Sequence, residues 1–223
     1  MSKELTKRII TSLFLLIGVY LMFSYIFLLI ILLILISIIS WIEFYGLISK
    51  ILTKKNIKIK LLKLLIKSLS LIYLTLFSFF IFNGITDNNY QLNMLYLMMI
   101  CVFSDIGGFL FGKIFKGKKL TKISPKKTIS GSIGSFLLSL ALVPFFQYFL
   151  SEKFNSTFDL ILLALIVSLS CQLGDLFISY IKRKAKVKNT GDLLPGHGGF
   201  LDRIDGILFA IPLGMILWKS LIS

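Results

Sequence analysis

Residues 26–49 read IFLLIILLILISIISWIEFYGLIS, an almost unbroken apolar run. A helix needs about 20 mainly apolar residues to cross the hydrocarbon core of a bilayer. Further apolar runs lie near residues 9–23, 61–82, 92–112, 131–150, 157–181 and 204–222. Because these runs are continuous rather than alternating, they indicate helices and not the strands of a membrane barrel. The predicted fold class is all-α, a polytopic membrane helical bundle of about seven transmembrane helices.

The composition supports lipid as the solvent for most of the chain. Of the 223 residues, 57% are hydrophobic, and the mean hydropathy is +0.91. A soluble domain of this length could not bury so much apolar surface. We expect two parts, three N-terminal spans in residues 1–90 and a catalytic transmembrane domain in 91–223, whose basic loops are 113–130 and 182–203.

The charge pattern predicts the orientation. The chain carries 25 Lys and Arg against ten Asp and Glu, a net charge of +15. If the N-terminus is cytosolic, 23 of the 25 cations lie on or just within the cytosolic side, as the positive-inside rule requires. The lysines are not part of a nucleic-acid motif with interleaved aromatics, so we expect no nucleic-acid partner. The prediction is a multi-pass protein of the cell (inner) membrane, with its active site facing the cytosol.

Four aspartates lie beside the apolar spans on this predicted cytosolic side. Ionisable groups at membrane depth are costly and are by default candidates for function. Asp105 and Asp175 lie near the ends of their spans, while Asp202 and Asp205 are spaced i,i+3, which places both on one face of a helix. Carboxylate oxygens are the ligands that Mg²⁺ prefers. The residues therefore predict a metal site made by Asp175, Asp202 and Asp205; the alternative is charge pairing with Lys182 and Arg203.

Two of the chain's three arginines, Arg183 and Arg203, fall in this same region. The arginine fork binds phosphate bidentately, so Lys182, Arg183 and Arg203 are candidate phosphate ligands. The alternative is an ordinary basic loop.

The segment PGHGG at residues 195–199 lies between Arg183 and Asp202. Glycines such as Gly198 and Gly199 allow backbone amides to approach a phosphate closely. His197, the only histidine, could donate a hydrogen bond to phosphate or position a headgroup.

A second cluster lies in the loop 113–130. Ser124, Lys126, Lys127 and Thr128 offer hydroxyl and ammonium groups just before an apolar run, where a helix N-terminus would favour an anion. The alternative is a solvated basic loop. For the glycines at 131 and 134, phosphate binding and small-residue helix packing are equally supported.

These motifs together resemble the phosphatidate cytidylyltransferase (CDP-diacylglycerol synthase) family. The resemblance covers about residues 100–212. It rests on SD at 104–105, FGK at 111–113, SPKKT at 124–128, GD at 174–175, SYIKR at 179–183, KN at 188–189 and LPGHGGFLDRID at 194–205. The family usually has Asp at the position of Asn189 and often an acidic residue at Ser130. Neither difference removes a member of the three-aspartate set, but both bear on activity and cation preference.

The resemblance implies that CTP and phosphatidate are converted to CDP-diacylglycerol and pyrophosphate with Mg²⁺; a second, monovalent cation is left open. Residues and resemblance together predict three sets. The catalytic set is Asp175, Asp202, Asp205, Lys182, Arg183, His197 and Arg203, and the metal set is Asp175, Asp202 and Asp205. The substrate-binding set is Asp105, Ser124, Lys126, Lys127, Thr128, Lys188, Gly198 and Gly199.

Other functions stay open at this point. A CTP-dependent lipid-alcohol kinase of the dolichol kinase type would release CDP instead of pyrophosphate. A cation-coupled transporter would hold its ionisable groups near the midplane, whereas these acids lie near one face. A non-catalytic relative and a homodimer also remain open.

Overall fold

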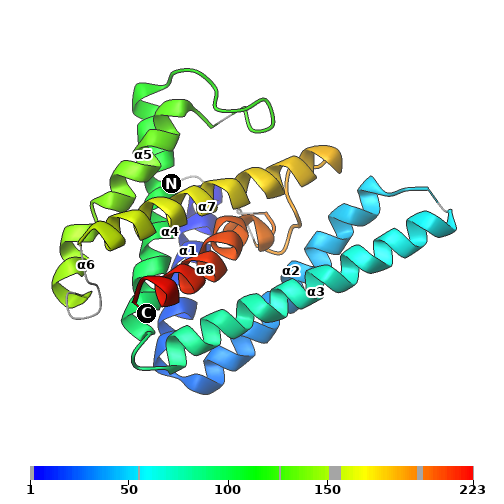
Figure 1. The fold of residues 1–223 in the computed structure, drawn as a ribbon. Coiled ribbons are helices and arrows are strands. Elements are labelled where there is room, and N and C mark those ends of the chain that lie inside the picture. Colours follow the sequence, from blue (N-terminus) through cyan, green and yellow to red (C-terminus); the bar gives the residue numbers. More distant parts are fainter. Residues whose placement is uncertain (1–2, 55, 126, 151–156, 195–197, 223) are drawn as a thin grey trace. The chain divides into compact units, whose positions relative to one another are not determined.

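The computed structural model describes residues 3–54, 56–125, 127–150, 157–194 and 198–222. Within these ranges every regular element is a helix, accompanied by two isolated β-bridges (Figure 1). The helices are α1 Lys3–Ser24, α2 Ile26–Ile51, α3 Ile57–Thr86, α4 Gln91–Phe115, α5 Ile129–Leu140, α6 Val143–Leu150, α7 Thr157–Lys184 and α8 Leu201–Ile222.

The predicted all-α, polytopic fold class is confirmed. Among the described residues, five helical segments are long and apolar enough to cross a membrane: α2, α3, α4, the α5–α6 segment and α7. The segment Ile10–Ser24 of α1 is a shorter apolar helix, and α8 covers the last predicted span. Each of the seven apolar runs thus coincides with a helical segment.

The chain folds into two compact units. The first unit comprises residues 1–86 and 181–204, and the second comprises 87–180 and 205–223. The segment 181–204 therefore belongs with helices that lie more than 90 residues earlier in the chain. The predicted division of function at residue 90 stays a prediction.

In the first unit, α2 and α3 lie side by side as an antiparallel pair (Figure 1). Polar groups between the apolar faces pair with each other, since lipid offers them no partner. The hydroxyls of Ser37 and Ser78 lie 2.7 Å apart, and Trp41 Nε1 donates to the Lys67 carbonyl at 3.1 Å. The Lys67 ammonium lies over the Trp41 ring, 4.7 Å from its centroid.

In the second unit, α4 and α5 approach each other through glycines. A Cβ atom on Gly107 would lie 2.7 Å from the carbonyl carbon of Gly134 and 3.0 Å from Ser135 Cα. This backbone contact also lets Ser135 Oγ donate to the Ser104 carbonyl at 2.7 Å. Close approach at small residues is the usual packing of membrane helices, and it favours the packing role for Gly134.

The helix after Gly134 is interrupted near Pro144, which separates α5 from α6. Proline has no N–H, so a helix that ran through Pro144 without a break would lack one backbone hydrogen bond. Here α6 begins at Val143, so Pro144 lies in its first turn, where the missing donor is tolerated.

Candidate active site

The second unit contains a pocket of about 260 Å³ between α4, the loop 116–128, α5 and α7. Its volume is a few times that of a phosphate group, and polar side chains make up much of its wall. The lining residues are Ser104, Asp105, Gly108, Phe109, Leu120, Ser124, Lys127, Thr128, Gly131, Ser132, Ser135, Gln172 and Asp175. The structure therefore brings together five residues predicted from sequence: Asp105, Ser124, Lys127, Thr128 and Asp175.

An ion pair joins the loop to α7 at this pocket. Lys127 Nζ lies 2.5 Å from Asp175 Oδ2, and the two side chains are 27% and 28% exposed. A charge-assisted hydrogen bond of this kind is stronger than a neutral one. The pair stays accessible to solvent, so a bound anion or cation could compete for either partner.

The loop 116–128 folds back on itself, and this fold directs Lys127 toward α7. Leu120 N donates to the Lys127 carbonyl at 2.8 Å, and Ile129 N donates to the Lys118 carbonyl at 3.0 Å. A turn precedes Lys127, whose own N–H donates to the Ser124 carbonyl at 3.0 Å. The loop backbone is thus held by its own hydrogen bonds.

Thr128 is the N-cap of α5. Its backbone is extended, and its hydroxyl accepts from Gly131 N at 3.1 Å. Ser130 Oγ donates to the Lys116 carbonyl, which ties the same helix end to the end of α4. Because Thr128, Gly131 and Ser132 all line the pocket, the first turn of α5 adds its partial positive charge to the charge of Lys127. This end of the pocket suits an anion.

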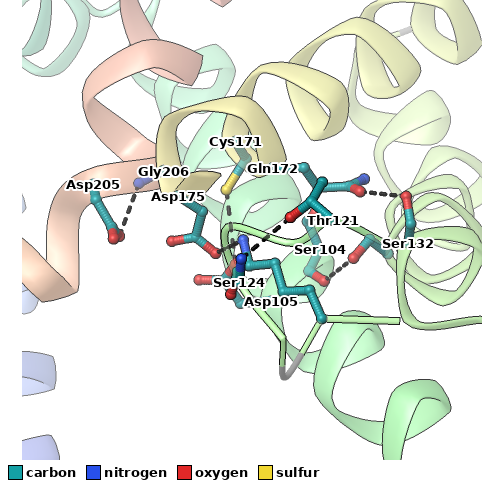
Figure 2. A network of polar contacts seen from close by, with 12 residues as sticks. Ser104, Asp105, Thr121, Ser124, Ser132, Cys171, Gln172, Asp175, Asp205 and Gly206 are labelled. Carbon is teal, nitrogen blue, oxygen red and sulfur yellow. Dashed lines mark hydrogen bonds and ion pairs between the residues drawn. The ribbon is translucent and has the colours of Figure 1, made fainter. Parts of the chain in front are cut away.

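Helices α4 and α7 supply the other wall, shown in Figure 2. Cys171 Sγ lies 3.8 Å from Asp105 Oδ1, and Ser132 Oγ donates to Gln172 Oε1 at 2.5 Å. The buried Nε2 of Gln172 has no hydrogen-bond partner among the described residues. Gln172 therefore joins the pocket wall on α7 to Ser132 of α5.

Asp205 lies in the second unit on α8, which crosses α7 at Gly174. The Cα of Gly174 faces the Asp205 carbonyl so closely that a Cβ would collide with it. The Asp205 carboxylate accepts from Gly206 N at 3.1 Å, as Figure 2 shows, and the residue is 8% exposed.

Asp202 lies in the first unit, where its carboxylate receives three donors. Lys182 Nζ is 2.5 Å from Oδ1, Thr190 N is 2.9 Å from Oδ2, and Gly199 N is 3.4 Å from the same oxygen. Charge pairing with Lys182, the alternative to a metal site in the sequence analysis, is thus present for Asp202. The Gly199 amide, predicted to face a phosphate, is directed at Asp202.

Two local features bring Lys182 and Gly199 to Asp202. The helix α7 ends in a Schellman motif: Lys186 is left-handed, with φ +55°, and Val187 N donates to the Lys182 carbonyl at 3.0 Å. Further on, Gly198 has φ +83°, and its N–H and carbonyl both bond to Leu194. The chain then returns to begin α8 at Leu201.

Sequence reasoning missed two residues of this arrangement, Thr190 and Glu43 of α2. Glu43 is 9% exposed and accepts hydrogen bonds from Thr190, Phe200 and Leu201. The available signal was the residue type, since Glu43 is the only acid between Glu4 and Asp87. An ionisable residue in an apolar span is itself a functional hypothesis.

Of the remaining predicted residues, three are exposed: Arg183, Lys188 and Arg203. The other two, Lys126 and His197, lie outside the described residues. In the part of the chain that is described, no group of three or more His, Cys, Asp or Glu side chains is placed to hold a metal ion. Asp202 belongs to the first unit and Asp175 and Asp205 to the second, and the Mg²⁺ site stays a prediction.

Comparison with known proteins gives the family. The family model described as Cytidylyltransferase family matches residues 3–221. Phosphatidate cytidylyltransferase of Rickettsia conorii is 43% identical over 139 residues, which are 59% of this chain and 59% of that protein. The protein of the same name from Staphylococcus aureus (strain COL) is 45% identical over 125 residues, 56% of this chain and 48% of that protein. The matched region thus spans about half to three-fifths of these relatives. The family match, which runs along almost the whole sequence, shows that the chain belongs to the cytidylyltransferase family.

Proposed function

We propose that this chain is a membrane nucleotidyltransferase that converts CTP and phosphatidate to CDP-diacylglycerol and pyrophosphate. The observation that carries the proposal is the pocket of the second unit, which is lined by Lys127 and the first turn of α5 together with Asp105 and Asp175. The named relatives act on phosphatidate, and the five candidate spans supply the lipid-facing surface that such a substrate needs.

The reaction needs little covalent work from the protein. An oxygen of the lipid phosphate attacks the α-phosphorus of CTP, and a new P–O bond forms. The bond from the α-phosphorus to the oxygen that bridges to the β-phosphorus breaks, and pyrophosphate leaves with that electron pair. Since the lipid phosphate is already anionic, no proton has to be removed, and catalysis consists mainly of positioning and charge neutralisation.

The residues can be assigned to these tasks. Lys127 and the capped N-terminus of α5 would hold phosphate oxygens of CTP, with Lys126, Lys182 and Arg183 stabilising the pyrophosphate as it leaves. Asp105, Ser124, Thr128, Lys188, Gly198 and Gly199 complete the proposed substrate-binding set, and His197 and Arg203 complete the proposed catalytic set.

Mg²⁺ is part of the proposal, with Asp175, Asp202 and Asp205 as its ligands. The donor chemistry fits, because these are hard carboxylate oxygens of the kind that Mg²⁺ prefers. Two of them, Asp175 and Asp202, each hold a lysine ammonium at 2.5 Å, so each carboxylate already binds a cation. When bound, Mg²⁺ would neutralise phosphate charge.

The proposed location is the inner membrane, with the pocket open to the cytosol. The support is the distribution of cations, since 23 of the 25 Lys and Arg fall on one side of the predicted topology. CTP would reach the pocket from the cytosol while the acyl chains of phosphatidate stay in the bilayer.

Pyrophosphate release tests the proposal. The purified chain in detergent, with CTP, phosphatidate and Mg²⁺, should release pyrophosphate only when phosphatidate is present. Asp202→Asn should lower the rate at least about 100-fold, because it removes one carboxylate charge from the proposed cation site.

The matched control is Asp87→Asn. Asp87 is an exposed turn residue whose Oδ1 accepts from Asn89 N, and asparagine keeps that acceptor. Asp87→Asn should leave the rate unchanged, and both variants should insert into membranes like the wild type. Release of CDP in place of pyrophosphate would refute cytidylyl transfer and identify a kinase, and full activity of Asp202→Asn would refute the role of Asp202.

A further inference from the structure

Glu43 of α2 is buried in an apolar helix, yet its carboxylate has a full set of donors. Oε1 accepts from Phe200 N at 2.9 Å. Oε2 accepts from Leu201 N at 2.9 Å and from Thr190 Oγ1 at 2.7 Å. All four residues belong to the first unit. The side chain is the acceptor in all three hydrogen bonds.

Two of these donors are backbone amides at the N-terminus of α8. Leu201 is the first residue of that helix and Phe200 precedes it. The first N–H groups of a helix have no carbonyl partner within the helix, and a phenylalanine side chain at the preceding position cannot provide one. Glu43 supplies this cap from a different helix, and its negative charge lies at the positive end of the α8 dipole.

Glycines on either side of the carboxylate make the close approach possible. A Cβ on Gly191 would lie 2.6 Å from Oε1, and a Cβ on Gly199 would lie 2.6 Å from Oε2. Any larger residue at these positions would push the loop away from Glu43. The segments 190–191 and 199–201 are thus both packed directly against one carboxylate.

The same backbone that binds Glu43 also binds Asp202. Thr190 donates its hydroxyl to Glu43 and its N–H to Asp202 Oδ2. Gly199, whose Cα faces Glu43, donates its N–H to that same oxygen at 3.4 Å. Displacing the loop from Glu43 would therefore turn or release the Asp202 carboxylate.

We propose that Glu43 is a positioning residue for Asp202, and that α2 is thereby required for the orientation of the Asp202 carboxylate. The inference rests on the proposed function for its effect on turnover. Its structural part, the hold of Glu43 on the start of α8, stands without it.

Glu43→Gln is the sharpest perturbation. Glutamine has one oxygen and one NH₂ group, so whichever way the amide turns, its NH₂ faces either Phe200 N–H or Leu201 N–H. One amide then loses its acceptor while side-chain volume is kept. Partners that orient a catalytic or metal-binding group typically change activity by about 10- to 100-fold, so we expect kcat to fall by about that factor with little change in KM for CTP.

The structural readout is hydrogen exchange of the amides in the described residues 198–204. The exchange of Phe200 and Leu201 should accelerate in Glu43→Gln, while exchange in α3 stays at the wild-type rate. Thr190→Val removes only the hydroxyl donor and should give a smaller change in the same direction, and Thr190→Ser should restore the wild-type behaviour. Ser40→Ala is the matched control, because Ser40 is buried in α2 one turn before Glu43 and its hydroxyl has no partner among the described residues.

The outcomes separate the possible failures. Unchanged exchange at Phe200 and Leu201 in Glu43→Gln would overturn the inference. Faster exchange with unchanged kcat would also overturn it, since Glu43 would then be a structural cap alone. If Glu43→Gln does not fold, Thr190→Val decides by the same two readouts. If the wild type itself shows no turnover, the proposed function fails, and the exchange rates still report whether Glu43 holds the start of α8.

Discussion

Substituting Gly107 by alanine tests the helix contact on which the pocket is built. Gly107 of α4 faces the backbone of Gly134 and Ser135 on α5. An added Cβ would collide with the Gly134 carbonyl oxygen and would lie 2.7 Å from its carbon, whereas ordinary contacts are 3.4–4 Å. Because the obstructing atoms are backbone, no rotamer change can relieve the collision. The two helices would have to separate by roughly 1 Å.

The magnitude follows from two opposing effects. Overpacking of a close contact typically costs about 1–3 kcal/mol, and a backbone collision belongs at the upper end. Replacing glycine by alanine inside a helix stabilises the folded state by about 0.5–1 kcal/mol. The net loss is therefore about 2 kcal/mol, which for a chain of this length lowers the melting temperature by roughly 4–8 °C. The Ser135–Ser104 hydrogen bond, which is 2.7 Å in the wild type, would lengthen with the helix separation.

The assay is thermal unfolding of the purified chain in one detergent, compared with Gly46→Ala. Gly46 is a helical glycine of α2 where an added Cβ would meet no neighbouring side chain or helix within 4 Å, so alanine there should leave the melting temperature unchanged or raise it slightly. If Gly107→Ala melted at or above the wild-type temperature, as Gly46→Ala should, the close backbone contact between α4 and α5 would be refuted.

Two further substitutions probe the second unit. Lys127→Met keeps most of the side-chain length but removes the charge that pairs with Asp175. Turnover should fall about 100-fold, while the melting temperature should change little, because a partly exposed ion pair contributes at most about 1 kcal/mol to stability. Normal turnover in this variant would contradict the proposed role of Lys127. Gly206→Ala should destabilise the protein, because its Cβ would lie 2.5 Å from Cys171 Sγ. Adding Cys171→Ala should recover much of the lost melting temperature. If the two substitutions instead lowered the melting temperature independently and additively, the two residues would not be in contact.

The membrane helices could be predicted from the sequence because lipid imposes a simple rule. Backbone polar groups in hydrocarbon must be satisfied within the segment, so a long apolar run is a helix. The apolar run 26–49 predicts a helix for this reason, and it coincides with α2. The helix that follows Asp202 was also predicted, from the apolar run 204–222, and it is α8.

The pocket was partly predictable. Thr128 and Lys127 stand just before an apolar run, which predicts a helix N-terminus, and Thr128 does cap α5. The role of Gly134 could not be decided, since glycine serves phosphate binding and helix packing equally well. Only the position of α4 decides it, through the contact with Gly107.

The partner of Glu43 could not be predicted. Its hydrogen bonds join residues 147 to 158 positions apart in the chain, and no local pattern encodes so distant a contact. The loop fold that directs Lys127 toward Asp175 could not be predicted either. It depends on backbone hydrogen bonds that join Leu120 to Lys127 and Ile129 to Lys118, rather than on a recognisable turn sequence.

The most direct test of the proposed reaction follows two labels of CTP into the products. The purified chain, given phosphatidate and Mg²⁺, should carry the α-phosphorus label of CTP into the lipid phase and leave the γ-phosphorus label in aqueous pyrophosphate. Chelation of Mg²⁺ should abolish the transfer. A γ-label in the lipid, or no phosphatidate-dependent label in the lipid at all, would contradict cytidylyl transfer by this chain.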